Sequence, residues 1–259
     1  MTLRKTYSTV RQLTANLLIF ALVFATNLGA QDRSEGQTRG SSQRTGSSNR
    51  APQNDPHEAG FVTYVDGDKT TCRDMTADEI ADLQGQADQR PQLRVITPVE
   101  RQEALRNTPF AAQAEGVNGL TITLRSTTQL DGFPEAKAAF IRAAAQWEAI
   151  IKNPISIIID VDYGPTRFGT AYPSGVLGST STPTAIQPYD TVRTRLLNSA
   201  GSTAETSLYT ALPTGSVSTD IGSLSSVSVA SPLNRALGLA PADAASTDTA
   251  PSIGFNSNF

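Results

Sequence analysis

One stretch of the sequence decides the fold, LTITLRSTTQLDGFPEAKAAFIRAAAQWEAIIKNPISIIIDVDY (Leu120–Tyr163). Apolar and polar residues alternate at both of its ends, which is the period of a half-buried β-strand. The first alternation runs through residues 120–125 and the second through residues 155–163. Between them, apolar residues recur every three or four positions, as in an amphipathic helix. The stretch therefore predicts a strand, a helix and a second strand.

The predicted helix has clear boundaries. Pro134 suits a first helical turn, where its missing N–H would have no partner. Asn153 precedes Pro154, and a residue before proline disfavours the helical conformation. We expect the core-facing residues to be those spaced by three and four positions, Ala136, Phe140, Ala143, Trp147 and Ile151. This interpretation places Phe140 and Trp147 in the core rather than in a pocket.

The link between the predicted helix and the second strand is short. A strand, a helix and a strand joined in this way form a crossover whose two strands are parallel neighbours. We therefore expect an α/β (α+β) fold built on a βαβ unit, with a mixed, mostly parallel sheet.

The composition of the 259 residues excludes several classes of function. A formal net charge of −3 gives no support for nucleic-acid binding. Cys72 is the one cysteine, which excludes an intrachain disulfide framework and a cysteine-rich zinc site, and we interpret it as a small buried or incidental residue. His57 is the one histidine, whereas catalytic zinc sites usually take two or three imidazoles. A serine hydrolase would also have to use His57, which has no partners around it.

Four segments are predicted along the chain. Residues 1–30 have a basic start and an apolar run, Leu17–Ala25, too short to span a membrane comfortably, as in a signal peptide cleaved after Ala30. Residues 31–59 are rich in Gly, Ser, Gln and Arg and predict a disordered linker. Residues 60–118 predict a small helical pre-region, and residues 119–259 a larger domain. We therefore expect a secreted or extracytoplasmic bacterial protein, with no membrane association after cleavage.

Short elements are predicted within the pre-region. Residues 61–65 alternate as in a short strand. Thr76 and Thr97 are each followed three residues later by a glutamate, the spacing of a capping box that starts a helix. Asp66, Gly67 and Asp68 lack the remaining oxygen ligands of a calcium loop and predict a turn.

The second half of the larger domain predicts mostly helices and loops. We interpret residues 164–188 as loop-rich, with Val176 and Leu177 in a short edge strand. Asp190 and Ser202 are candidate helix caps. Three further elements are expected: a strand at residues 224–230, a helical turn from residue 231 to residue 238, and a strand starting at residue 252.

Two carboxylates are the most suggestive side chains for chemistry. Asp160 and Asp162 lie two apart on a predicted strand, so they point to the same side of the sheet. Such a pair could bind a cation or act as an acid and a base. The interpretation that we favour is that both simply face water. The sequence contains no H-E-x-x-H, P-loop, G-x-G-x-x-G or G-x-S-x-G motif.

The segment FPEAKAAFIRAAAQWEAIIKNPISIIIDVDYGP resembles the first helix and second strand of secreted bacterial zinc metalloproteases of the H-E-x-x-H class. The pieces VLGST, YDTVRTRLL, SLYTALP, NRALGL and IGFNSNF are also similar to segments of that family, in the same order. The resemblance covers roughly residues 120–259. It implies zinc as cofactor and a peptide or protein as substrate in the complete family. No catalytic residue, cofactor-binding residue or metal ligand of the family falls on any position of this sequence.

The resemblance implies that residues 119–259 are the N-terminal part of a metalloprotease-like catalytic domain. We expect the chain as given to be inactive, because the H-E-x-x-H helix is absent, and to expose the face on which that helix would pack. The alternative is a non-catalytic secreted or cell-surface binding module that recognises a peptide by adding it to an exposed sheet edge.

Overall fold

The computed structural model describes residues 57–66, 69–85, 92–109, 119–219 and 222–259. The chain divides into two compact units, one of Pro52–Val217 with Ser223–Phe259 and one of Met1–Ala51 with Ser218–Gly222. The main sheet belongs to the first of these units. The predicted signal peptide and most of the predicted linker lie outside the described residues.

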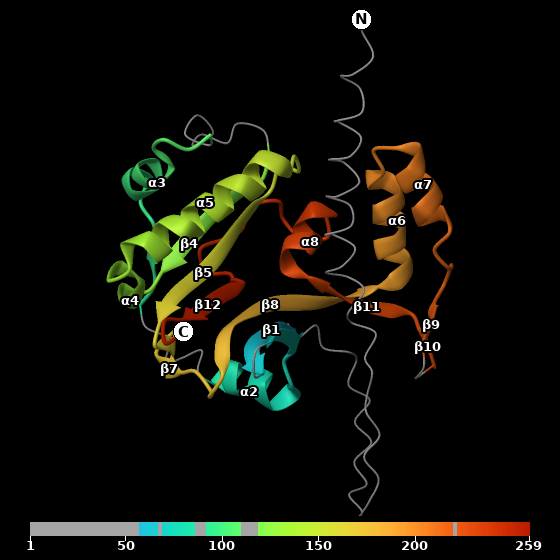
Figure 1. The fold of residues 1–259 in the computed structure, drawn as a ribbon. Coiled ribbons are helices and arrows are strands. Elements are labelled where there is room, and N and C mark those ends of the chain that lie inside the picture. Colours follow the sequence, from blue (N-terminus) through green and yellow to red (C-terminus); the bar gives the residue numbers. More distant parts are fainter. Residues whose placement is uncertain (1–56, 67–68, 86–91, 110–118, 220–221) are drawn as a thin grey trace, which may run out of the picture. The chain divides into compact units, whose positions relative to one another are not determined.

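A mixed eight-stranded sheet forms the centre of this unit (Figure 1). Its strands lie in the order β2-β1-β8-β12-β5-β4-β3, and β11 pairs with the far half of β8. Their bounds are β1 (His57–Asp66), β2 (Lys69–Asp74), β3 (Arg94–Val95), β4 (Thr121–Ser126), β5 (Ser156–Gly164), β8 (Val176–Pro188), β11 (Ser226–Ala230) and β12 (Ser252–Asn256). The predicted α/β class with a mixed sheet is confirmed. The expectation of a mostly parallel sheet is wrong. In the described sheet the parallel pairings are β4 with β5 and β5 with β12, and the antiparallel pairings outnumber them.

Short strands and helices surround the sheet. The helices are α2 (Ala77–Gly85), α3 (Pro98–Leu105), α4 (Thr128–Asp131), α5 (Pro134–Ile150), α6 (Tyr189–Ser199), α7 (Thr203–Thr210) and α8 (Ser231–Ala236). The strands β6 (Thr166–Arg167) and β7 (Thr170–Ala171) form a small hairpin after β5. The strands β9 (Val217–Thr219) and β10 (Gly222–Leu224) form another two-stranded sheet.

The predicted strand, helix and strand are β4, α5 and β5. The two strands are parallel, with Leu124 beside Ile159, and α5 lies across them (Figure 1). The main hydrophobic core lies between α5 and these strands, and it includes Ile122, Leu124, Ile141, Ala144, Ala145, Ile157 and Val161. The predicted βαβ unit is therefore confirmed.

The predicted core face of α5 is confirmed in part, since Ala136, Phe140 and Ile151 pack half-buried against the core, whereas Ala143 and Trp147 are exposed. The buried residues of the helix are Ile141, Ala144 and Ala145, whereas Trp147 is 44% exposed. A charged residue of α5, Glu148, faces the sheet and is mostly buried. Glu148 accepts a hydrogen bond from the backbone N–H of Ile122 at 2.7 Å and pairs with Arg101, so it satisfies a strand group that β3 is too short to reach.

The predicted pre-region is not a separate helical unit. Its strands β1 and β2 form a hairpin that joins the main sheet through β8, and β3 joins it through β4. The strand predicted at residues 61–65 and the helices predicted after Thr76 and Thr97 are confirmed as β1, α2 and α3. Thr97 and Glu100 form the predicted capping box. His57 already belongs to β1, so the predicted linker ends before residue 59.

The segment predicted as loop-rich, residues 164–188, contains the longest strand of the described sheet. The predicted strand at Val176 and Leu177 is the start of this strand, which is long and central rather than a short edge strand. Strand β8 pairs with β1 on one side, and with β12 and then β11 on the other. Its serines and threonines are not solvent-facing loop residues, since Ser179, Ser181 and Thr184 are buried. Pro183 follows the part paired with β12 and precedes the part paired with β11, where its missing N–H is best tolerated.

The remaining elements follow the sequence more closely. Ser202 caps α7 as predicted, and Gly238 follows α8 with a φ of 65°. Asp190 lies in the first turn of α6 and is not its cap; it accepts a hydrogen bond from the backbone N–H of Gly215 at 2.8 Å. The strand predicted at residues 224–230 is divided between β10 and β11, and the strand predicted at residue 252 is β12.

Candidate functional site

An open groove lies where the first half of α5 meets the ends of β5 and β12. Its volume is about 910 Å³, and its lining is mostly apolar. The lining residues are Gly132, Phe133, Pro134, Glu135, Ala136, Ala139, Phe140, Arg142, Ala143, Tyr163 and Phe255. A concave, mostly apolar surface with a few polar groups is the usual form of a binding site.

Two aromatic pairs shape the groove. The ring of Phe133, just before α5, meets the ring of Tyr163 edge to face, with centroids 5.0 Å apart. The ring of Phe140, on α5, lies 5.9 Å from that of Phe255. Gly178 of β8 makes room for the second pair, because a Cβ atom there would come within 2.7 Å of the Phe255 ring. The pairs therefore join the helix to the sheet at both sides of the groove.

The sheet face that carries α5 is left open over β12. Phe255 lies beside Tyr163 in the parallel pairing, so both side chains share this face. Phe255 is 46% exposed and Ile253 is half-buried, whereas Ser252 and Gly254, which point to the opposite face, are buried. The groove is thus the edge of a larger uncovered surface on one side of the sheet.

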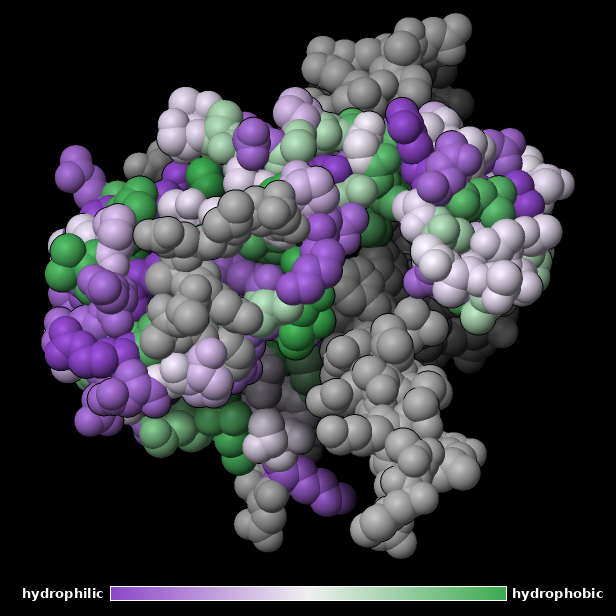
Figure 2. Space-filling model, turned by 90° about the horizontal axis from the view of Figure 1, so that it is seen from above, coloured by the Kyte–Doolittle hydropathy of each residue, from purple (hydrophilic) through white to green (hydrophobic). Residues whose placement is uncertain are grey.

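The uncovered surface continues on β8 and on α5. On β8, Thr180 lies opposite Ile253 and is half-buried, while Ser181, on the other face, is 1% exposed. On α5, the apolar row of residues continues to Trp147, one turn beyond Ala143. Apolar residues also interrupt the hydrophilic surface in several places in the view of Figure 2.

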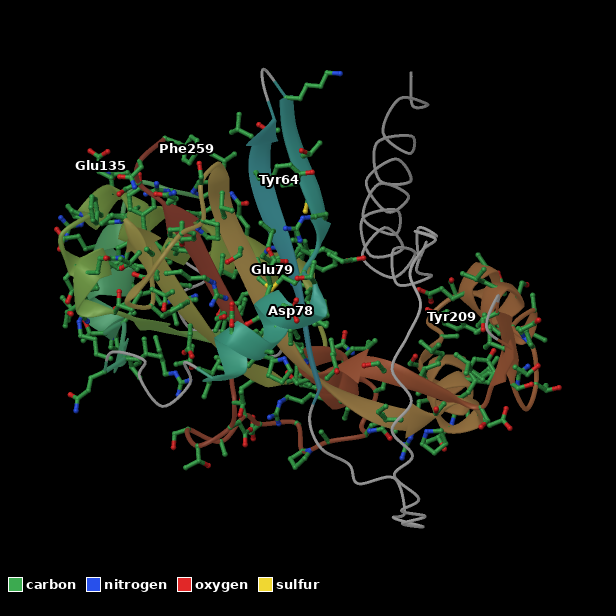
Figure 3. The ribbon with its side chains drawn as sticks, turned by 90° about the horizontal axis from the view of Figure 1, so that it is seen from below. Tyr64, Asp78, Glu79, Glu135, Tyr209 and Phe259 are labelled. Carbon is green, nitrogen blue, oxygen red and sulfur yellow. The ribbon has the colours of Figure 1, made fainter. Side chains whose placement is uncertain are left out.

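Two opposite charges border the groove. Glu135 and Arg142 are exposed and lie seven residues apart, so they point to the same side of α5. No ion pair within the described residues includes either of them. Figure 3 labels Glu135 at the start of this helix. The site therefore offers an apolar floor with one negatively charged and one positively charged side chain along one wall.

Asp160 and Asp162 do not face water, contrary to the favoured interpretation. They are 2% and 0% exposed. Asp160 accepts two hydrogen bonds from the Arg125 guanidinium, at 2.6 and 3.0 Å. Asp162 accepts hydrogen bonds from the hydroxyl of Thr127 at 2.5 Å and from the backbone N–H of Phe168 at 2.6 Å. Both carboxylates therefore stabilise the fold on the sheet face opposite α5 and are not in the groove.

The other candidates from the sequence lie elsewhere. Cys72 is an exposed free thiol on β2, so it is not a core residue. His57 is at the start of β1, opposite Thr184. Of the predicted turn at residues 66–68, only Asp66, at the end of β1, is described. Among the residues that the structure describes, no three His, Cys, Asp or Glu side chains are grouped so that they could hold a metal ion.

Shifted pKa values in the described residues belong to structural contacts rather than to the groove. The pKa of Glu79 falls to about 2, chiefly because Arg73 donates hydrogen bonds to it. Figure 3 shows Glu79 on α2, beside the hairpin that carries Tyr64. The pKa of Tyr172 is raised by burial. These shifts identify well-anchored ion pairs and packing, not a proton-transfer centre.

Sequence reasoning found part of the groove. Phe140 was assigned to the core, and it does pack half-buried against the core, but it also lines the groove. Phe255 and Tyr163 were missed as partners, because their contact with α5 depends on β12 lying beside β5. The sequence did single out these two residues, because each is the one aromatic residue of its strand.

Comparisons with known proteins add no identification, because no family model, curated protein or solved structure matches this chain. Within the described part of the chain, no helix combines the length and the apolar character needed to cross a membrane.

Proposed function

We propose that this chain is the N-terminal scaffold of a secreted zinc-dependent metallopeptidase domain. In this proposal the open surface beside α5 receives the helix that carries H-E-x-x-H, supplied by polypeptide outside these 259 residues. The observation that carries it is the uncovered surface around Phe255 and Trp147. An apolar sheet face is normally covered by helices, and here α5 lies over β4 and β5 and leaves Phe255 of β12 46% exposed. The sequence resemblance supports the same placement.

The part of the chain that the structure describes offers no site that would fit a zinc ion. The sequence has one histidine, and the described residues contain no group of metal-binding side chains. Peptide hydrolysis by this class of enzyme requires the bound metal. The proposed role of this chain is therefore to form the sheet and one wall of the cleft, with a peptide or protein as the substrate of the complete domain.

The test is to purify the full chain and measure its zinc content and its hydrolysis of casein. We expect less than stoichiometric zinc and no hydrolysis above background. Stoichiometric zinc together with cleavage that EDTA abolishes would contradict the proposal that the metal ligands lie elsewhere. A second test reads the genomic DNA downstream of the Phe259 codon in three frames, and the lack of any H-E-x-x-H helix there would remove the proposal.

A second candidate function is favoured by the edge strand β2. It is the last strand of the sheet order, and all six of its residues are exposed. The backbone groups on such an edge can pair with an extended peptide. A non-catalytic binding module would use this edge. Binding of an unstructured peptide that is lost when Thr71 is replaced by proline would favour this function.

A further inference from the structure

The open surface beside α5 has a charge pattern as well as an apolar floor. Glu135 and Arg142 lie about 10 Å apart along the helix axis, since seven residues rise 1.5 Å each. Both are exposed, and no ion pair in the described part of the molecule uses them. Lys137, on the same helix, is by contrast already paired with Glu100 and Asp131.

The shape of the surface suits a helix. Small residues at Ala136, Ala139 and Ala143 let a neighbouring helix approach α5 closely, at the usual 8–10 Å between axes. Phe140 and Phe255 provide the floor between the two helices. The groove follows α5 over residues 134–143, which is about three helical turns.

We infer that the surface beside α5 binds an amphipathic helix that carries a cation and an anion two turns apart, the cation facing Glu135 and the anion facing Arg142. The inference rests on the proposed function in one respect, that the bound helix is the one that carries H-E-x-x-H. Residues seven apart lie on one side of a helix, so a partner can place both charges against α5 while its apolar face covers Phe255. The charges then fix the register of the partner along α5.

The test uses the full chain and three synthetic helical peptides of about 18 residues, without tryptophan or histidine. They share one apolar face and differ at two positions seven apart, which hold Lys and Glu, two Lys, or two Glu. Trp147 is the one tryptophan of the chain and lies one turn beyond the groove, so its emission reports binding. We expect a blue shift, with the mixed-charge peptide binding about threefold to tenfold more tightly than either like-charge peptide.

A charge reversal makes the test specific. In Glu135→Lys, the wall carries two cations, so the peptide with two Glu should become the tightest binder. The matched control is Glu103→Lys on the exposed side of α3, which should leave the order of the peptides unchanged. Circular dichroism checks that both variants are folded.

Absence of binding, equal affinity for the three peptides, or an unchanged order in Glu135→Lys would overturn the inference. These peptides contain no histidine and therefore no H-E-x-x-H motif. Charge-selective peptide binding can therefore be observed even if the zinc assay contradicts the proposed function. If no peptide binds, this inference is wrong, and the zinc assay still tests the proposed function separately.

Discussion

Asp162 joins three parts of the chain, the start of α4, strand β5 and the β6–β7 hairpin, through one buried carboxylate. Its oxygens accept hydrogen bonds from the side chains of Thr127 and Gln129 and from the backbone N–H groups of Tyr163 and Phe168. We expect Asp162→Ala to lower the free energy of unfolding by about 3 kcal/mol or more, because several buried donors lose their acceptor together. Urea denaturation measures the loss.

The control for that prediction is Asp78→Ala, an exposed acid in the first turn of α2. We expect a change of about 0.5 kcal/mol or less. Equal losses in the two variants would show that Asp162 does not anchor the fold.

For single residues, the sequence predicts which side of a strand a side chain occupies, but not whether that side chain is buried. Alternation correctly placed Asp160 and Asp162 on one side of a strand. Their donors, Arg125 and Thr127, lie 35 residues away in the chain. The parallel pairing of the two strands was predicted, but burial of these carboxylates also depends on the register of β4 beside β5 and on the β6–β7 hairpin, and the local pattern shows neither.

Helix α5 allows its two candidate core faces to be compared directly. Ile141 is 2% exposed, and Ile141→Ala should lower the free energy of unfolding by about 2–5 kcal/mol through cavity formation. Trp147 is 44% exposed, and Trp147→Ala should cost less than about 1 kcal/mol in the isolated chain. Urea denaturation of both variants checks the assignment. A larger loss of unfolding free energy in Trp147→Ala than in Ile141→Ala would show that Trp147 faces the core, as the sequence predicted.

An ion-pair network joins β3, α3, α4 and α5. Arg94 donates hydrogen bonds to Glu100 and Asp131 and thereby lowers the pKa of both carboxyls, and Lys137 also pairs with both. A lowered folded-state pKa stabilises the fold at pH values above the unfolded pKa, near 4, and this stabilisation disappears as the pH falls through the folded value.

We therefore expect the free energy of unfolding to fall as the pH is lowered from about 5 to about 2. Arg94→Met should flatten this dependence and should cost only about 1 kcal/mol at neutral pH, because the pairs are partly exposed. Denaturation curves at several pH values measure both effects. A slope as steep in Arg94→Met as in the natural chain would show that other carboxyls are responsible.

Elements with strong local signals were predicted well, and one without them was not. Capping residues located the starts of α2, α3 and α7. Only the start of strand β8, Val176 and Leu177, was predicted as a strand, because its later Ser, Thr, Gly and Pro residues are typical of loops. It is a strand because partners on both sides use its backbone, which no local property of the segment reveals.

The first unit as a whole exposes apolar surface that an isolated domain normally buries. Phe255, Trp147 and Ile150 are each more than 40% exposed. We expect the full chain to bind the dye ANS and to self-associate with rising concentration. Substituting Trp147→Lys together with Phe255→Ser should reduce both, as measured by ANS emission and light scattering. A monomer that does not bind ANS would argue against an open docking surface.

For the molecule as a whole, the sequence predicts the βαβ centre and the α/β class. The site could be predicted only in part. Its helical wall is local, whereas its floor comes from β12, more than a hundred residues further along the chain than Phe140. Which part of the sheet face is covered and which is open follows from the order of the strands, and the sequence alone does not give that order.

The position of β12 has a consequence for synthesis on the ribosome. This strand is inserted between β5 and β8, although both of those precede it by more than sixty residues. Until residues 252–256 have emerged, β5 and β8 each keep a row of unsatisfied backbone groups in the middle of the future sheet. A nascent chain in this state is prone to pair with a neighbour, so holding factors that shield extended segments should matter most in the interval between the emergence of β8 and that of β12.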